Sequence, residues 1–130
     1  MLPTELNDNN GKLLRDCVNQ YVSLWKLEAP FQSWLDQHCQ FTDTLVDRIV
    51  VGYPADSIVA LQDELGYEDS LLDQAEPFSL WVIGDPALAS RLPLNSSKFH
   101  VEFTDHIQAF KEQKVRILNG AHTSMVLGAY

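Results

Sequence analysis

Three strand-like runs, clustered between helical segments, restrict the folds open to this 130-residue chain. Thr, Val and Ile are dense over residues 41–51, residues 78–83 form a compact apolar run, and residues 99–103 alternate between apolar and polar side chains. The runs do not alternate regularly with helices, as they would in a doubly wound sheet. We therefore predict an α+β fold, with a small mixed or antiparallel sheet of about three strands, flanking helices and a long C-terminal helix.

Helices are predicted where apolar side chains recur every three or four residues. One helix is expected to begin after Gly11, a shorter one to span residues 31–38, and a third to span residues 55–65 and end at Gly66. The first of these has an apolar stripe made of Leu13, Leu14, Cys17, Val18, Tyr21, Val22 and Trp25.

The second half of the chain holds the longest predicted helix. The acidic residues 68–76 are expected to form a turn or short helix, and residues 91–97 a loop. Thr104 or Asp105 is then expected to cap a helix that runs almost to the last residue. One side of this helix carries Ile107, Phe110, Lys114, Ile117, Ala121 and Met125.

The charge balance excludes some partners. The chain has 18 acidic and 9 basic residues, a net charge of −9, which argues against nucleic-acid or anionic-membrane surfaces, since these need clustered Lys and Arg. No apolar run reaches the length of about 18 residues that a membrane span needs. The polar start is not a secretory signal, so we expect a cytoplasmic protein whose Cys17 and Cys39 are free, buried thiols.

Several common ligand motifs are missing from the sequence. The histidines and cysteines do not follow a zinc spacing, so we expect no metal. The glycines are too far apart for a dinucleotide fingerprint or a P-loop, standing at positions 11, 52, 66, 84, 120 and 128.

The stretch KVRILNGAHT, residues 114–123, places polar side chains on a core-like helix. At about 100° per residue, His122 lies about 80° and Asn119 about 140° from Lys114, so the three share one broad side. In a partly dry cavity such a lysine exchanges protons near neutral pH, and the other two offer hydrogen bonds. The alternatives are a snorkelling lysine, a satisfied core histidine and an Asn-Gly helix end. Spacing alone leaves both interpretations open.

The same stretch resembles the signature of the mannitol dehydrogenase family of long-chain polyol and sugar-acid dehydrogenases. The segments LPTELNDNNGKLL, residues 2–14, and FTDTLVDRIVVGYP, residues 41–54, agree with it in order and spacing. The ending at residues 120–123 is most similar to the tagaturonate-reducing branch. The resemblance therefore covers nearly the whole chain.

The resemblance implies an NAD-dependent interconversion of a keto sugar acid and its alcohol, tagaturonate and altronate, without a metal. Lys114 would be the general acid/base, Asn119 would help hold the developing oxyanion, and His122 would orient the reacting oxygen. Asn10 is the candidate for a second oxyanion donor. Asp47 would lie beside the substrate, although an ion pair with Arg48 is the alternative for that carboxylate.

Members of the resembled family are several times longer than this chain, so we expect an internal fragment. Residues 1–104 would be the end of the N-terminal nucleotide-domain region, without its Gly-rich loop, and residues 105–130 the first helix of the C-terminal helical domain. Without that loop the chain alone is expected to bind NADH weakly or not at all, and to show no turnover.

Two other functions stay open. The chain could be a catalytically silent α+β module that self-associates through the open apolar stripe of its last helix, as a dimer or higher oligomer. A scaffold unrelated to dehydrogenases is the third alternative.

Overall fold

The computed structural model describes residues 1–94 and 99–129, so part of the predicted loop, residues 95–97, lies outside the described residues. The chain divides into two compact units, one formed by residues 1–46 and 80–130 and the other by residues 47–79. We call them the main unit and the small unit. Among the described residues no helix combines the length and apolar content that spanning a bilayer requires.

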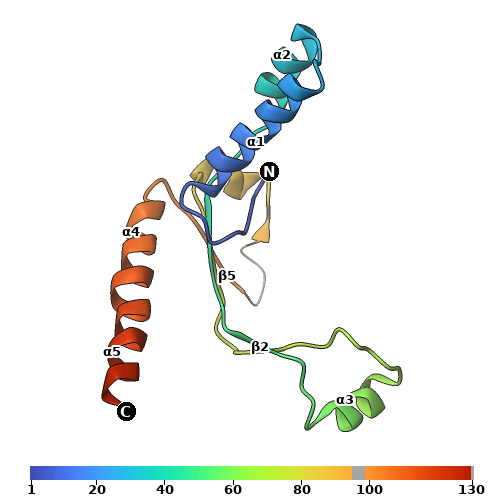
Figure 1. Cartoon of the computed structure of the whole chain (residues 1–130), viewed down its shortest axis with the longest axis vertical. Helices are drawn as coiled ribbons and strands as arrows, with labels where there is room; N and C mark the ends of the chain where they lie inside the picture. Colours follow the sequence, from blue (N-terminus) through green and yellow to red (C-terminus); the bar gives the residue numbers. More distant parts are fainter. Residues whose placement is uncertain (95–98, 130) are drawn as a thin grey trace. The chain divides into compact units, whose positions relative to one another are not determined.

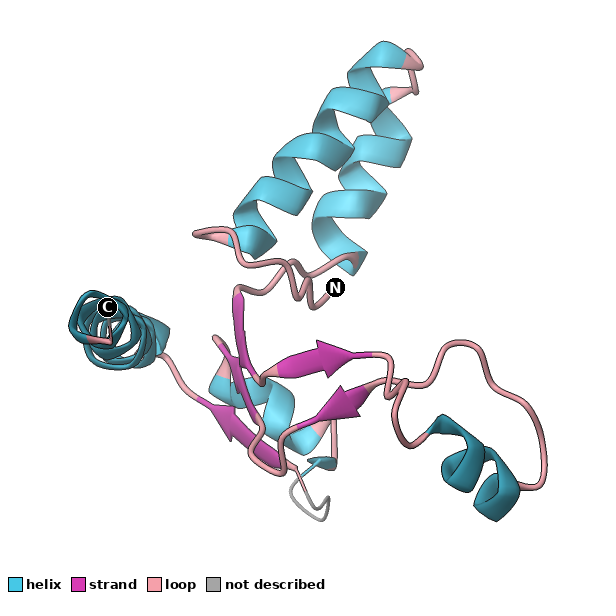
Figure 2. Ribbon diagram, turned by 60° about the horizontal axis from the view of Figure 1, so that its bottom comes forward, coloured by secondary structure: helices cyan, strands magenta, loops and turns pink. Residues whose placement is uncertain are grey.

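Two helices lie side by side at the start of the main unit (Figures 1 and 2). They are α1 (Asn10–Leu24) and α2 (Ala29–His38), close to the bounds that the apolar spacing predicts. Val22 of α1 and Leu35 of α2 are the buried apolar residues of the pair. The two cysteines are free as predicted, but their predicted burial is wrong: Cys17 is exposed and Cys39 half-buried. Each helix has only a few buried residues, and Cys17 is not on the buried side of α1.

The main unit contains a three-stranded sheet with the order β1-β4-β5. Strand β1 covers Thr44–Asp47, β4 covers Leu80–Ile83 and β5 covers His100–Phe103. Strands β4 and β5 are parallel, with Leu80 opposite His100 and Ile83 opposite Phe103. The short 3-10 helix η1 (Pro86–Ser90), which the sequence pattern did not indicate, follows β4 in the chain. Val82 and Ile83 are fully buried, and the predicted α+β class is confirmed.

The small unit pairs β2 (Val50–Gly52) antiparallel with β3 (Gln74–Ala75), and contains α3 (Ile58–Leu65). Residues 41–51 were expected as one strand, and this is wrong, because the run is divided into β1 and β2. Between these strands Arg48 Nε donates to the carbonyl oxygen of Glu76 at 3.1 Å, and the Ile49 amide donates to Glu76 Oε1 at 2.7 Å. The Arg48 side chain and the Ile49 backbone are therefore both bonded to Glu76, the residue that follows β3.

The last helical segment is continuous but not α-helical throughout (Figure 1). It consists of α4 (Ile107–Glu112), η3 (Gln113–Asn119) and α5 (Gly120–Gly128), and η3 is a π-helix. The Gly120 amide bonds to the carbonyl oxygen of Val115, five residues earlier. The helix also begins later than predicted, with His106 as the N-cap residue, while the Thr104 hydroxyl accepts the His106 amide at 2.9 Å.

The side-chain amide of Asn10 joins three segments of the main unit. Asn10 is 3% exposed, and its Nδ2 lies 3.1 Å from the carbonyl oxygen of Pro3, 3.0 Å from that of Glu5 and 3.0 Å from that of Thr44. Its Oδ1 accepts the Thr44 amide at 2.9 Å. The Thr44 hydroxyl donates to the Pro3 carbonyl as well. The N-terminal segment, the start of α1 and β1 are therefore held by one buried polar cluster.

The next residue, Gly11, allows α1 to approach the segment before β1. A Cβ at Gly11 would lie 2.5 Å from the carbonyl carbon of Thr42, so this position must be glycine for the packing to hold. Asp43 uses the close approach, because its Oδ1 accepts the Gly11 amide at 2.8 Å and the Lys12 amide at 3.3 Å. A carboxylate from outside the helix thus caps the α1 N-terminus, where the helix dipole favours negative charge.

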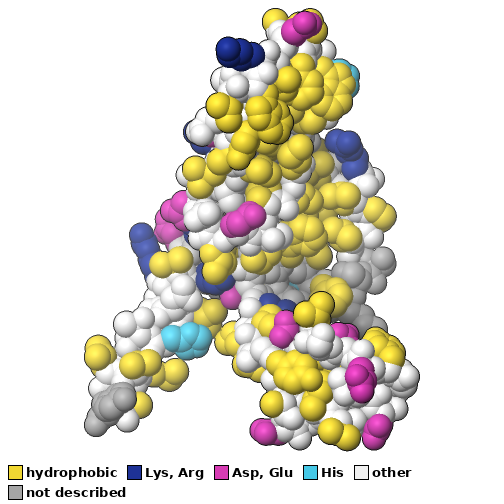
Figure 3. Space-filling model, turned by 45° about the vertical axis from the view of Figure 1, so that its right-hand side comes forward, with side chains coloured by type: hydrophobic (Ala, Val, Ile, Leu, Met, Phe, Trp, Pro, Cys, Tyr) yellow, Lys and Arg dark blue, Asp and Glu magenta, His cyan; other side chains and the backbone are white. Residues whose placement is uncertain are grey.

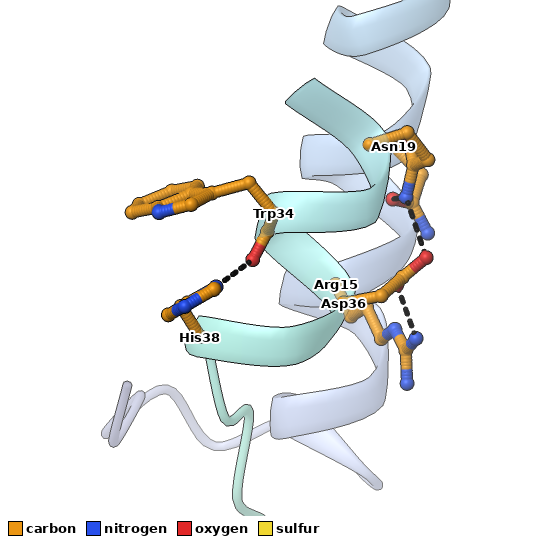
Figure 4. A network of polar contacts seen from close by, with 6 residues as sticks. Arg15, Asn19, Trp34, Asp36 and His38 are labelled. Carbon is orange, nitrogen blue, oxygen red and sulfur yellow. Dashed lines mark hydrogen bonds and ion pairs between the residues drawn. The ribbon is translucent and has the colours of Figure 1, made fainter. Parts of the chain in front are cut away.

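An exposed polar network links α1 to α2 (Figure 4). Arg15 donates to Asp36 Oδ1 at 2.7 Å, and Gln32 donates to Asp36 Oδ2 at 3.3 Å and to Asn19 Oδ1 at 3.2 Å. His38 lies on the other side of α2, where its ring stacks on Trp34. Hydrogen bonds from Gln32, and then from Arg15, lower the pKa of the Asp36 carboxyl below its ordinary 3.8.

Replacing Asn10 with Ala is expected to lower the free energy of unfolding by about 2–4 kcal/mol, because it leaves buried carbonyl oxygens and the Thr44 amide without partners. Urea denaturation followed by circular dichroism measures the change. Asn7→Ala, an exposed change in the same segment, is the control and should stay within about 0.5 kcal/mol. A loss for Asn10→Ala as small as that of the control would contradict the role of the cluster.

The Asp36 pKa gives a pH-dependent prediction. A lowered folded pKa means that the stabilisation is complete above the unfolded pKa, near 3.9, and is lost as pH falls through the lower folded value. An NMR titration of the Asp36 carboxyl should show a midpoint below 3.8. Gln32→Ala should raise this midpoint and Gln37→Ala, an exposed change on the same helix, should leave it unchanged. An unshifted midpoint in Gln32→Ala would show that Gln32 is not the main cause.

Candidate functional site

A cavity of about 160 Å³ lies in the main unit, between the N-terminal segment, the start of β1 and the last helical segment. This volume is below the range of about 300–1,000 Å³ typical of drug-sized ligands, so it suits a small molecule. The polar and charged side chains at the cavity are those of Glu5, Asn7, Asp8, Asn9, Asp43, Thr44, Gln108, Lys111, Lys114 and Asn119.

Lys114 lines the cavity rather than extending into open solvent. Its side chain is half-buried, and Nζ donates to the carbonyl oxygen of Val46 in β1 at 2.8 Å. This bond joins residues 68 positions apart and fixes the amine beside the cavity. Of the two alternatives for this lysine, snorkelling outward or ending at a cavity, the structure shows the second.

The π-helical turn changes the geometry that α-helical spacing gave for Asn119. In a π-helix the hydrogen bonds connect residues five apart, so a residue and the fifth one after it are one turn apart on the same side. Asn119 is five residues after Lys114, and both line the cavity. The predicted separation of about 140° assumed the α-helical rotation of 100° per residue, and a π-helix turns by less at each residue. Mid-helix π turns are frequent at functional sites.

The other predicted site residues lie elsewhere. His122 is exposed on α5 and is not among the residues that line this cavity. Asp47 is half-buried, ends β1 and begins the small unit. Asn10 has both amide hydrogens directed to backbone carbonyls, which is the arrangement of a structural residue. Its role as an oxyanion donor stays a prediction that this bonding does not favour, and the roles of His122 and Asp47 stay predictions.

Lys111 and Asp8 are charged residues at the cavity that the sequence pattern did not single out. Lys111 precedes Lys114 by three residues, and its ammonium forms an ion pair with Asp8. The Lys111 side chain is 22% exposed, against 78% for Asp8, so most of the lysine is covered. The available signal was the spacing of three between the two lysines, which places them on one helix face. The partner Asp8 could not be inferred, because it lies far away in the sequence.

The charges around the cavity are nearly balanced. Glu5, Asp8 and Asp43 supply carboxylates, and Lys111 and Lys114 supply ammonium groups. Asp43 accepts the amides at the start of α1, and Asp8 pairs with Lys111. The net charge of −9 for the whole chain therefore does not predict which ligands this site accepts. The two lysines can donate charge-assisted hydrogen bonds to a negatively charged ligand.

The glycine that follows β4 is packed against the backbone of the protein. Gly84 follows β4 and precedes the short helix η1. A Cβ there would lie 2.9 Å from the carbonyl oxygen of Asp43, so this glycine serves close packing within the protein. Its amide also donates to that oxygen at 2.9 Å and is not directed at a ligand. The described residues also contain no group of three or more His, Cys, Asp or Glu side chains suited to a metal ion.

Residues 1–96 match the Rossmann domain of mannitol dehydrogenases, which is most of the chain. The chain belongs to the mannitol dehydrogenase family, and this excludes the unrelated scaffold. Among its relatives are altronate oxidoreductases of Yersinia pestis bv. Antiqua (strain Nepal516), 53% identical over 131 residues, and of Pectobacterium carotovorum subsp. carotovorum (strain PC1), 49% identical. The altronate oxidoreductase of Escherichia coli O1:K1 / APEC is also 49% identical. Each alignment covers the whole chain and 27% of the relative, so the chain spans about a quarter of their length.

Proposed function

We propose that the Lys114 cavity is the proton-transfer and substrate side of an oxidoreductase that interconverts a keto sugar acid and its alcohol. Tagaturonate and altronate are the proposed pair, since the relatives are altronate oxidoreductases. The observation that carries this proposal is the lysine held on Val46 at a small cavity, with Asn119 one π turn away.

Lys114 has the chemistry of a general acid/base. Its ammonium gives a proton to the carbonyl oxygen as the carbonyl carbon is reduced, and its neutral amine removes that proton from the alcohol in the reverse direction. The Val46 carbonyl accepts a hydrogen bond from the amine and orients it. Asn119 donates from its side-chain amide to the oxygen on which negative charge develops.

Three further residues support this site in the proposed enzyme. His122 orients the reacting oxygen, and Asp47 contacts the substrate. Asn10 keeps the N-terminal segment and β1 in place, and both segments supply walls of the cavity.

NAD is the proposed cofactor of the whole enzyme, because the matched region is a Rossmann domain. It would supply the hydride. The described residues lack the glycine-rich turn that binds its pyrophosphate, so we assign no NAD site to them. Residues 1–104 are proposed as nucleotide-domain sequence and residues 105–130 as the first helix of a following helical domain. A sugar-acid metabolic enzyme of this kind is proposed to work in the cytoplasm.

Exchange of domains tests the role of Lys114. A chimera in which this chain replaces the matched 131 residues of the Yersinia pestis relative should oxidise altronate. Lys114→Met in that chimera should lower kcat at least about 100-fold, since general acid/base catalysis typically contributes that much. Lys12→Met, which changes a lysine that is 70% exposed on α1, should leave kcat unchanged. A folded chimera without turnover, or one in which Lys114→Met keeps full turnover, would count against the proposal.

A second candidate function is a catalytically silent module that self-associates. The end of the last helix favours it, because large apolar side chains there are exposed: Val115, Ile117, Met125, Val126 and Leu127 are between 52% and 80% exposed. The α1–α2 pair also carries exposed apolar side chains (Figure 3). Exposed apolar surface promotes association where it forms a contiguous patch.

Sedimentation velocity distinguishes the second candidate. Self-association through α5 predicts a concentration-dependent dimer or larger species that Leu127→Glu shifts towards monomer, because a charge is costly in an apolar interface. Ser124→Glu adds the same charge on α5 without removing apolar surface, and should shift the equilibrium less. A monomer at all concentrations would rule out self-association by this route.

A further inference from the structure

The ammonium group of Lys111 has no part in the proton transfer assigned to Lys114. It lines the same cavity from one turn earlier on the same helical segment. A lysine whose side chain is only 22% exposed differs from an ordinary surface lysine such as Lys12, at 70%. The protein therefore brings a second, largely covered cation to a cavity that needs only one for acid/base chemistry.

The donors of Lys111 are only partly used. A lysine ammonium has three N–H donors and no acceptor. Asp8 takes one of these donors through its ion pair. Asp8 is itself 78% exposed, so it holds the ammonium from the solvent side of the cavity wall. Two donors are left for a ligand, and a charge-assisted bond to a carboxylate is the strongest use of them.

The surrounding carboxylates make this donor selective. Asp43 and Asp8 are themselves anions, which accept from the α1 amides and from Lys111, so they repel a carboxylate ligand and cannot bind it. Together with Glu5 they give the cavity no general positive field. A carboxylate that enters the cavity must therefore bind to a specific hydrogen-bond donor. Lys114 is assigned to the reacting oxygen, which leaves Lys111.

We propose that Lys111 binds the carboxylate of the sugar-acid substrate and so makes the site selective for acids over neutral polyols. This inference rests on the proposed function of the same cavity. Lys114 and Lys111 then divide the substrate between them, the first taking the oxygen that changes oxidation state and the second the charged end. Asp8 is the positioning residue that holds Lys111 in place.

Binding to the 130-residue chain tests the inference independently of turnover. The ¹⁵N-labelled chain is titrated with altronate and with altritol, the uncharged polyol, and Kd is taken from the shifts of the Lys114 and Asn119 amides. The wild-type chain should bind altronate at least tenfold more tightly than altritol. Lys111→Gln should abolish this preference and change the Kd for altritol less than twofold, and Lys111→Arg should restore it.

Asp8→Asn separates recognition from simple structural support. Asp8→Asn and Lys111→Gln both break the ion pair between these residues. If that ion pair only supports the structure, the two substitutions should change the Kd of altronate and of altritol equally. Carboxylate binding by Lys111 predicts that Asp8→Asn keeps the preference for altronate. Equal losses for both ligands in Lys111→Gln, or no loss, would overturn the inference while leaving the cavity as the binding site. A folded wild-type chain that binds neither ligand would overturn the proposed function and this inference with it.

Discussion

The buried side-chain amide of Asn10 is the interaction on which the rest of the main unit depends. Burying an amide is costly unless each of its polar atoms has a partner, and here the Pro3, Glu5 and Thr44 backbones supply them. The bonds can form only where the N-terminal segment, the start of α1 and β1 meet. Gly11 makes that meeting possible, since any side chain there would overlap Thr42. The N-terminal segment and β1, which form two walls of the cavity, are consequently held in place without a ligand.

The third wall is helical, and its π turn decides which side chains reach the cavity. Seven residues, Gln113–Asn119, adopt the wider helix, and this brings Asn119 to the side of Lys114. The lysine amine is then held by Val46, on the strand that Asn10 also bonds through Thr44. The cavity is therefore bounded by a π-helical turn and by β1. The bond to Val46 fixes the Lys114 amine in advance, so the lysine loses less freedom when a ligand binds.

The distribution of apolar surface sets a different constraint. The fully buried apolar side chains are few, with Val82 and Ile83 at the centre of the sheet, while large apolar residues are exposed on α1, α2 and α5. Such surface is costly in water, so it favours either association or coverage by further polypeptide. The polar cluster, the strand pairing and the α1 cap hold this unit together in addition to its buried apolar residues.

Local pattern was sufficient for much of the fold. The apolar spacing indicated α1, α2, α3 and the last helical segment. The strand-like runs indicated β4, β5 and a longer strand that contains β1, and the α+β class followed from their order. The stretch at residues 114–123 also identified Lys114 and Asn119, because a lysine on an apolar stripe is conspicuous in the sequence. These features depend on neighbours within one or two turns, and the sequence displays such neighbours directly.

The tertiary structure decided the features that depend on distant partners. Glu76 divides the expected strand at Arg48 and Ile49, and Thr44 engages the amide of Asn10 that the sequence analysis assigned to the substrate. Asp8 reaches Lys111 across about a hundred residues, and the π turn moves Asn119 beside Lys114. The physical reason is the same in each case. A hydrogen bond or ion pair between remote segments exists only after the chain has folded, so spacing along the sequence determined which side chains are available, and packing determined what each one binds.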